Sequence, residues 1–201
     1  NLFIMFFSNL LIKNTLSSYN SFIWDSHLKK LKKIKNFKPI NINLLIGIDR
    51  QKKTLLKNTE SFASGNFTNN ALLWGSRGNG KSSLIKSIFY VINKNYKKLK
   101  LLQLNKNDIF DIEIIYEKLG VFNNFRFIIF IDDLSFEKID SDYKIIKSTL
   151  DGSIQNQPNN ILLYVTSNRR HLMPRDMIEN ERSSAIHTDE SVEEKISLSD
   201  R

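Results

Sequence analysis

The chain has 201 residues, 41% of them hydrophobic and 25% charged, which is the composition of a globular protein with a substantial core. It has no cysteine, so a disulfide scaffold, a thiolate metal site and a cysteine nucleophile are excluded, and its three histidines show no metal-ligand spacing. The net charge of +9 permits contact with nucleic acid or an anionic membrane, although a bias toward Asn, Lys and Ile can also arise from an A/T-rich genome.

Two N-terminal segments favour helices. The apolar run from Leu2 to Ile12 is too short to span a membrane, so we expect a buried helix there, with an incomplete targeting segment as the alternative. Residues Trp24 to Lys38 carry apolar side chains at helical spacing among six lysines, which predicts either a basic patch for nucleic acid or acidic lipid, or a solvated helix face. We divide the chain into a Lys-rich helical extension, residues 1–40, and a second domain, residues 41–201. Both ends look like cuts, so we expect a fragment.

The second domain alternates helices and strands. The expected helices begin at an Asp49 N-cap, after residue 80, at an Asn107 or Asp108 cap, and at Asp142. The expected strands are Ala71–Trp74, Leu99–Leu104, Phe127–Ile131 and Ile161–Thr166. This alternation predicts a three-layer α/β/α fold with a parallel sheet.

A glycine-rich loop follows the first of these strands. Gly75, Gly80, Lys81 and Ser82 fit the G-x-x-x-x-G-K-[ST] phosphate-loop pattern. Glycines let backbone N–H groups turn toward phosphate oxygens, the lysine supplies a positive charge, and the serine hydroxyl is placed to ligate Mg²⁺. The predicted nucleotide-binding residues of this stretch are Gly75, Ser76, Arg77, Gly78, Asn79, Gly80, Lys81, Ser82 and Ser83.

The strand from Phe127 to Ile131 ends in two acids, which is a Walker B pattern. A buried strand delivers carboxylates to its carboxyl end, where nucleotide sites lie in open α/β sheets. We expect Asp132 to hold Mg²⁺ and Asp133 to orient or deprotonate the attacking water, with Glu137 as a rival for the base.

The last predicted strand ends in Thr166, Ser167 and Asn168. If it inserts between the first and third strands, Asn168 faces the γ-phosphate; the alternative is a helix N-cap role for Ser167 or Asn168. The stretch from Asn105 to Asp108 fits the guanine-recognition pattern Asn-Lys-x-Asp, but it precedes the Walker B strand, so we interpret it as a turn and helix cap.

Together these motifs resemble the AAA+ branch of P-loop ATPases. Residues 47–52, 132–137, 166–172 and 193–201 further resemble an uncharacterised bacterial AAA+ family, domain of unknown function 815, over about residues 44–201. The resemblance implies a cytoplasmic ATPase that uses ATP and Mg²⁺, with Ile48 near adenine and Asn168 as sensor 1. It also implies a homo-oligomer in which Arg201 acts as an arginine finger on a neighbouring subunit's nucleotide. Asp133 stands where most AAA+ proteins have Glu.

An AAA+ core has five parallel strands in the order 5-1-4-3-2 and a helical lid, whereas we find four strands and no lid. Strand Ala71–Trp74 is then a sheet edge, so we expect weak nucleotide binding and aggregation. The leading function is ATP hydrolysis coupled to remodelling or loading of a macromolecular partner, with nucleic acid left open. The alternatives are a slowly hydrolysing nucleotide-dependent switch and a small-molecule P-loop kinase.

Overall fold

The computed structural model describes residues 2–134 and 157–168, with side chains from residue 9 onward. The helices are α1 Leu2–Ser18, α2 Asp49–Ala63, α3 Lys81–Asn93 and α4 Ile112–Gly120, with 3₁₀ turns η1 Ile42–Leu44 and η2 Lys106–Asp111. The strands are β1 Ser21–Asp25, β2 Lys30–Lys33, β3 Ala71–Trp74, β4 Leu99–Leu104, β5 Arg126–Ile131 and β6 Ile161–Ser167. The predicted helix from Asp142 lies outside these residues.

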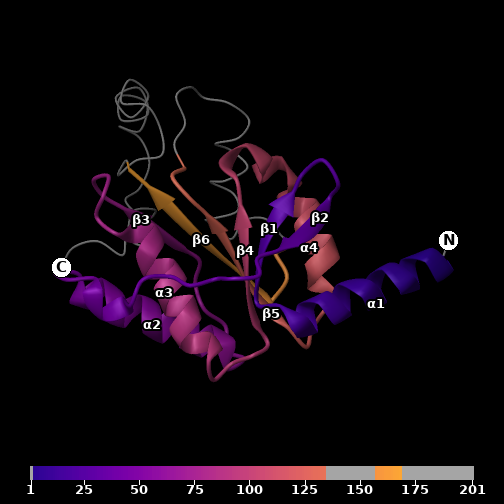
Figure 1. The fold of residues 1–201 in the computed structure, drawn as a ribbon, viewed down its shortest axis with the longest axis horizontal. Coiled ribbons are helices and arrows are strands. Elements are labelled where there is room, and N and C mark those ends of the chain that lie inside the picture. The colour runs from indigo at the N-terminus through magenta and orange to yellow at the C-terminus, as the bar shows by residue number, and fades with distance from the viewer. Residues whose placement is uncertain (1, 135–156, 169–201) are drawn as a thin grey trace, which may run out of the picture.

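The six strands form one sheet in the order β2-β1-β4-β5-β6-β3, shown in Figure 1. All neighbouring pairs are parallel except β1 and β2. The last strand, β6, inserts between β5 and β3, as predicted. Within the described residues β3 pairs only with β6, so β3 is a sheet edge, which also agrees with the prediction.

Helices cover both faces of the sheet, which confirms the three-layer prediction. On one face, α2 and α3 bury the apolar residues Leu55, Phe62, Leu84, Ile85, Ile88, Phe89 and Ile92 against β4, β5 and β6. On the other face, α4 buries Ile112, Ile115, Tyr116 and Leu119. Strands buried on both sides are mostly apolar, which explains why β4, β5 and β6 are found close to their predicted bounds, although β4 also contains Lys100 and Gln103.

A buried polar contact joins α2 to the centre of the sheet. Tyr164 of β6 is buried, and its hydroxyl lies 2.8 Å from Thr59 Oγ1 and accepts a hydrogen bond from Asn58 Nδ2 at 3.0 Å. Thr59 Oγ1 donates to the Leu55 carbonyl at 2.7 Å, so the Tyr164 hydroxyl donates to Thr59. Burial raises the pKa of Tyr164 to about 12, which keeps the phenol neutral and able to donate.

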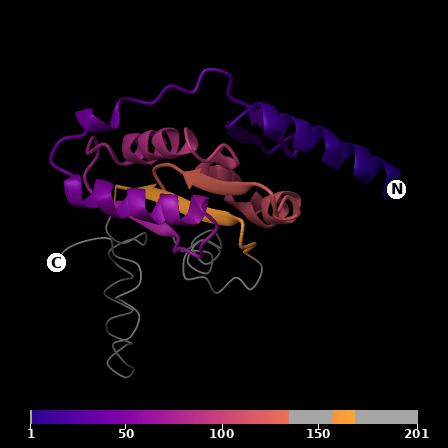
Figure 2. The ribbon, with the colours of Figure 1, turned by 90° about the horizontal axis from the view of Figure 1, so that it is seen from below.

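The prediction that α1 is buried is wrong for the side chains that the structure describes. Leu16 is fully buried, but Leu10 is 43% exposed and Leu11 is 67% exposed. The N-terminal part of α1 extends away from the sheet in Figures 1 and 2, so only its C-terminal end reaches the core.

The helix predicted over Trp24–Lys38 is also wrong, because this segment contains the end of β1, a turn and β2. Phe22 and Trp24 alternate into the core, and β1 pairs in parallel with β4 from Ser21 to Ile23. In the turn, Lys29 adopts a φ of 47°, which a helix does not permit. The pairing with β4 overrides the helical spacing of the apolar residues, which is a weak local signal.

Two smaller expectations concern helix starts. The stretch from Asn105 forms a turn, as predicted, in which the Asp108 N–H donates to the Asn105 carbonyl at 2.9 Å. The helix expected to begin at an Asn107 or Asp108 cap is divided into η2 and α4, whose N-caps are Asn105 and Asp111, so the predicted cap is wrong. Asp49 is the first residue of α2, and Ile48 is its N-cap without a side-chain hydrogen bond, so the predicted Asp49 cap is wrong by one residue.

Candidate functional site

The glycine-rich loop connects β3 to the N-terminus of α3. Gly75, Gly78 and Gly80 all have positive φ angles, of 148°, 85° and 74°. Gly80 is the N-cap of α3, and a Cβ there would lie 3.1 Å from Leu45 Cδ2, so both its φ and its surroundings favour glycine. This conformation leaves the loop in front of the N-terminal end of α3, where helix N–H groups and the dipole favour an anion.

Lys81 connects the loop to the end of β6. Its Nζ donates to the carbonyls of Gly75 at 2.8 Å and Ser76 at 2.9 Å, and to Asn168 Oδ1 at 3.1 Å. An ammonium group held by three oxygens is fixed at one place rather than sampling solvent. The lysine and the asparagine, which are 87 residues apart in sequence, therefore lie in one site.

Asp132 is the second centre of the site. Its Oδ1 accepts a hydrogen bond from Ser82 Oγ at 2.5 Å and another from Thr166 Oγ1 at 2.6 Å. The serine comes from the first turn of α3, the aspartate from the end of β5, and the threonine from β6. The register explains this meeting, because Ile131 pairs with Val165 and the next residue of each strand then lies side by side.

Asp133 adopts a left-handed backbone conformation with a φ of 52°. Its N–H donates to Thr166 Oγ1 at 2.9 Å, and its carboxylate accepts a hydrogen bond from Asn168 Nδ2. The Leu134 N–H donates to the Thr166 carbonyl at 2.8 Å, which holds the chain as it leaves β5. Short polar side chains such as Asp tolerate this backbone conformation, and here it directs the carboxylate toward Asn168.

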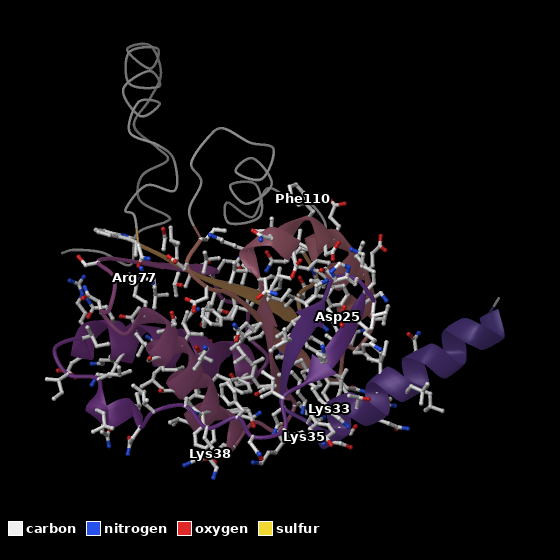
Figure 3. The ribbon with its side chains drawn as sticks, turned by 45° about the horizontal axis from the view of Figure 1, so that its top comes forward. Asp25, Lys33, Lys35, Lys38, Arg77 and Phe110 are labelled. Atoms are coloured by element: carbon white, nitrogen blue, oxygen red, sulfur yellow. The ribbon has the colours of Figure 1, made fainter. Side chains whose placement is uncertain are left out.

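The other predicted nucleotide-binding residues lie around the loop. Ser76, Arg77 and Asn79 are exposed, Ser83 is half-buried in the first turn of α3, and Figure 3 shows Arg77 at the outer edge of the molecule. Ile48 is half-buried and packs against the core formed by α2 and α3.

Thr166 and Leu45 are site residues that the sequence motifs do not identify. Thr166 is 1% exposed and touches both predicted acids, while Leu45 is buried and supports the loop at Gly80. A polar residue at the carboxyl end of an otherwise apolar strand is the sequence signal that could have identified Thr166.

Glu137 and Arg201 lie outside the described residues, so the choice between Asp133 and Glu137 and the role of Arg201 remain predictions. The same holds for the N-cap alternative for Ser167 or Asn168, because the chain after Asn168 is not described. Over residues 2–134 and 157–168, no group of three or more acidic or histidine side chains could hold a metal ion. In the same ranges, no helix is long and apolar enough to cross a membrane.

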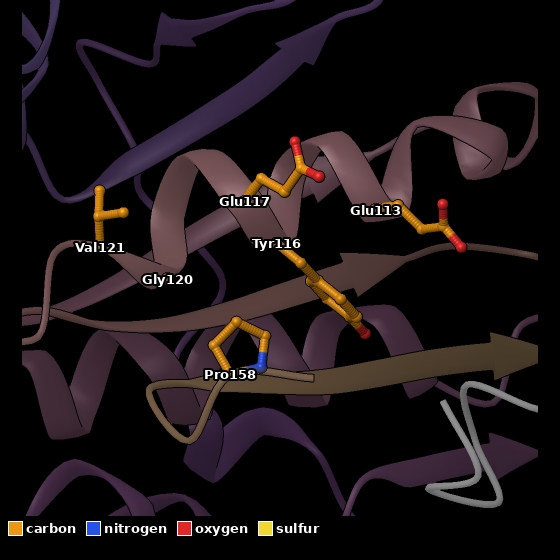
Figure 4. Close-up of a pocket in the computed structure, with 6 residues that line it drawn as sticks. All are labelled: Glu113, Tyr116, Glu117, Gly120, Val121 and Pro158. Atoms are coloured by element: carbon orange, nitrogen blue, oxygen red, sulfur yellow. The ribbon is translucent and has the colours of Figure 1, made fainter. Parts of the chain in front are cut away.

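A pocket of about 370 Å³ lies along α4, shown in Figure 4. Glu113, Tyr116, Glu117 and Gly120 of α4 line it together with Pro158, and none of the predicted site residues does. The Tyr116 hydroxyl is buried without a hydrogen-bond partner, and burial raises the pKa of Tyr116 above its usual value. This pocket is therefore separate from the phosphate-loop site.

Comparisons with known proteins address the family and the fold. A protein-family model described as a protein of unknown function, DUF815, matches residues 17–201. A comparison with curated proteins gave no match.

Solved structures are similar at low sequence identity. The chain is similar to a chain of the E. coli MS115-1 HORMA:CdnC:Trip13 complex, with a TM-score of 0.53 and 11% identity over 73% of this chain and 64% of that one. It is also similar to C. elegans PCH-2, with a TM-score of 0.45 and 19% identity over 64% and 40% of the two chains. It is similar, too, to a single-residue variant of Thermotoga maritima RuvB, with a TM-score of 0.45 and 20% identity over 71% of this chain and 46% of that one. The chain thus spans between 40% and 64% of the length of these proteins.

The strand order, with β6 between the Walker B strand and the phosphate-loop strand, agrees with this likeness in fold. The family match covers most of the chain, including the hairpin β1–β2. The chain therefore belongs to the DUF815 family of proteins of unknown function, and its fold is that of an AAA+ P-loop NTPase.

Proposed function

We propose that this protein binds ATP together with Mg²⁺ and hydrolyses it. The observation that carries this proposal is the meeting of three segments at the carboxyl end of the sheet: the loop at Lys81 and Ser82, the acids Asp132 and Asp133, and the end of β6 at Asn168. Each segment contributes one part of a phosphoryl-transfer site, namely a phosphate cradle, a cation ligand and a group that positions water.

The loop suits the phosphates of a nucleotide. Three positive-φ glycines, the N-terminal end of α3 and the Lys81 ammonium present donors and positive charge to one region. When ATP binds, the Lys81 Nζ can exchange its bonds to the Gly75 and Ser76 carbonyls for bonds to phosphate oxygens. This lysine is then a point charge at the β/γ-phosphates, as in other phosphate loops.

Ser82 and Asp132 suit a magnesium ion. Ser82 Oγ and Asp132 Oδ1 are 2.5 Å apart, so a hydroxyl and a carboxylate oxygen are available at the same place. Mg²⁺ prefers oxygen ligands and keeps several waters, so one or two protein ligands are sufficient. The bound ion would neutralise charge on the β- and γ-phosphates.

Asp133 and Asn168 are proposed to position the attacking water. Both side chains are exposed, and the Asn168 amide joins Lys81 on one side to Asp133 on the other. A water held by the Asp133 carboxylate can give up its proton there as it attacks.

The slowly hydrolysing switch remains a second candidate because of Asp133. Its side chain is one methylene shorter than glutamate, and the carboxylate already accepts a hydrogen bond from Asn168. Both features keep the carboxylate close to β5 and farther from the attacking water. Under the switch hypothesis, Asp133→Glu raises the turnover number, whereas a fall in turnover supports Asp133 as the working base.

Remodelling or loading of a macromolecular partner by an oligomer is the finer part of the proposal. Arg201 in trans would make the turnover per molecule rise with protein concentration, and Arg201→Ala would remove this rise. Turnover that is independent of concentration from nanomolar to high micromolar protein would contradict the assembly.

The central experiment separates binding from hydrolysis. Lys81→Ala should weaken binding of a fluorescent ATP analogue about 10- to 100-fold, because one charge-assisted hydrogen bond to the nucleotide is lost. Asp133→Asn should retain binding with Mg²⁺ present and lower turnover about 10²- to 10⁴-fold. Lys53→Ala, which removes an exposed lysine from α2, is the matched control and should change neither. Binding and turnover that survive in Lys81→Ala would refute the proposed function.

A further inference from the structure

Lysines from three chain segments gather at the end of the sheet opposite the phosphate loop. We name this surface the lysine face: it consists of Lys33, Lys35, Lys38, Lys94, Lys97 and Lys98. All six side chains are exposed. Figure 3 shows Lys33, Lys35 and Lys38 along one edge of the molecule, whereas Arg77 of the phosphate loop lies at the other.

Specific contacts hold the three segments together. The end of β2 is fixed where the Ile34 N–H donates to the Ser21 carbonyl at 2.8 Å, and the start of β4 where the Leu101 N–H donates to the Asn20 carbonyl at 2.9 Å. The segment after β2 then crosses α3, with the rings of Phe37 and Phe89 edge to face at 5.7 Å.

A second contact fixes this crossing, because Ser87 Oγ donates to the Ile40 carbonyl at 2.7 Å. Phe37 and Ile40 of the crossing segment therefore lie against α3, and Lys35 and Lys38 lie next to them in the chain. The C-terminal end of α3 leads to Lys94 and then to Lys97 and Lys98.

Among the residues that the structure describes, no acid forms an ion pair with these lysines. The sequence has no Asp or Glu between residues 26 and 48 or between residues 61 and 107. The three ion pairs among the described residues involve Lys29, Lys32 and Lys52, and none involves the lysine face. The buried Lys100 beside it has its pKa lowered to about 8, first by burial and then by the charge of Lys97. The positive potential of the lysine face is therefore not neutralised by the parts of the chain packed around it.

Aromatic rings lie among the lysines. Lys33 Nζ is 4.7 Å from the centroid of the Tyr19 ring, and Lys94 Nζ is 5.4 Å from the centroid of the Tyr90 ring. Tyr90 is 42% exposed, so part of its side chain is accessible to a ligand. Alternating cations and exposed rings are the combination that binds single-stranded nucleic acids, with cations on phosphates and rings under bases.

We propose that the lysine face binds the phosphodiester backbone of single-stranded nucleic acid, with Tyr90 as a stacking surface. A membrane surface is the less favoured partner, because such a surface needs a broad apolar face to enter the lipid, whereas Ile40 and Val91 are only partly exposed, at 47% and 37%. This site is at the opposite end of the strands from Lys81 and does not depend on the proposed ATPase.

The test measures fluorescence anisotropy of a labelled 20-nucleotide oligothymidine with the full chain, between 50 and 300 mM salt. Two triple variants remove the face: Lys33→Gln/Lys35→Gln/Lys38→Gln and Lys94→Gln/Lys97→Gln/Lys98→Gln. The control Lys53→Gln/Lys57→Gln/Lys106→Gln removes the same charge from exposed positions elsewhere. Each face variant should bind at least about tenfold more weakly at 50 mM salt and reduce the slope of log K against log salt by about 2, since each phosphate contact contributes about 0.7.

Tyr90→Ala separates stacking from charge. It should weaken oligothymidine binding several-fold without changing the salt slope, because no cation is lost. Thermal melting of every variant confirms folding, and a variant that melts early is replaced by the single substitutions of the same set.

Three results would overturn the proposal. The control triple could lose as much affinity as the face variants, which would show that net charge alone attracts the oligonucleotide. The full chain could fail to bind the oligonucleotide at 50 mM salt. It could also bind vesicles with 30% phosphatidylserine and not the oligonucleotide, which would identify a lipid surface. Loss of ATP binding in Lys81→Ala with oligonucleotide binding retained would support the independence of the two sites.

Discussion

Thr166 offers a direct test of how the site is held together. Its Oγ1 donates to Asp132 at 2.6 Å and accepts the Asp133 N–H at 2.9 Å, so one hydroxyl positions both acids. Thr166→Val keeps the shape of the side chain and removes only these two bonds. Thr166 is 1% exposed, so water cannot take the place of the hydroxyl without a rearrangement of the core.

The expected loss of turnover in Thr166→Val follows from the free energies of these two hydrogen bonds. A hydrogen bond to a charged carboxylate is worth about 1.5–3 kcal/mol and one from a backbone N–H about 1 kcal/mol. If most of this energy serves to position Asp132 and Asp133 during reaction, turnover falls about 30- to 300-fold. The melting temperature should fall by only about 3–8 °C, because the two acids are partly accessible to water in the variant.

The assay is steady-state ATP hydrolysis with Mg²⁺, together with binding of a fluorescent ATP analogue. Thr166→Ser is the matched control, since it keeps the hydroxyl and loses the methyl group. We expect Thr166→Ser to retain turnover within a few-fold of the unchanged protein and Thr166→Val to lose it while still binding nucleotide. Equal turnover in the two variants would refute the role given to the hydroxyl.

Two further predictions concern buried groups outside the site. Tyr164→Phe removes two hydrogen bonds and should lower the free energy of unfolding by about 1–3 kcal/mol. Tyr116→Phe removes an unpartnered hydroxyl and should leave stability unchanged or higher. Thermal melts that rank the two variants the other way would contradict this prediction. Lys100 has a pKa lowered to about 8 when folded and an ordinary value of 10.5 when unfolded, so between these values the unfolded state binds more protons and stability rises with pH. From about pH 8 to about pH 10, the unfolding free energy of the unchanged protein should therefore rise relative to that of Lys100→Met. Denaturant titrations at several pH values measure this difference. A difference that stays constant with pH would show that the buried amine does not titrate.

Short-range patterns in the sequence were sufficient to predict the phosphate loop, four of the strands and α3. The phosphate loop was predicted from fixed spacing, and β3, β4, β5 and β6 were predicted from apolar runs that end in turns or polar residues. These signals are reliable because a strand buried on both faces is apolar at most positions, although β4 also holds the buried Lys100. The helical face of α3 was equally clear, since Leu84, Ile85, Ile88, Phe89 and Ile92 repeat at helical spacing and all are buried.

Local patterns failed where long-range pairing decided the conformation. The segment from Trp24 has apolar residues at helical spacing, but the backbone hydrogen bonds of β1 to β4, which lies far along the chain, hold it as a strand. The apolar residues of α1 predicted burial, yet only Leu16 among its described apolar side chains is fully buried. In both cases the partner surface, rather than the segment itself, determines the outcome.

The sequence by itself determined the chemistry at the tip of each strand: a lysine and a serine after β3, two acids after β5, and a polar end to β6. Only the tertiary structure decided that Thr166 joins Asp132 to Asp133, that Asn168 joins Lys81 to Asp133, and that lysines from three segments share one surface. The physical reason is the strand order. Because β6 inserts between β3 and β5, side chains far apart in sequence become neighbours at the carboxyl end of the parallel strands.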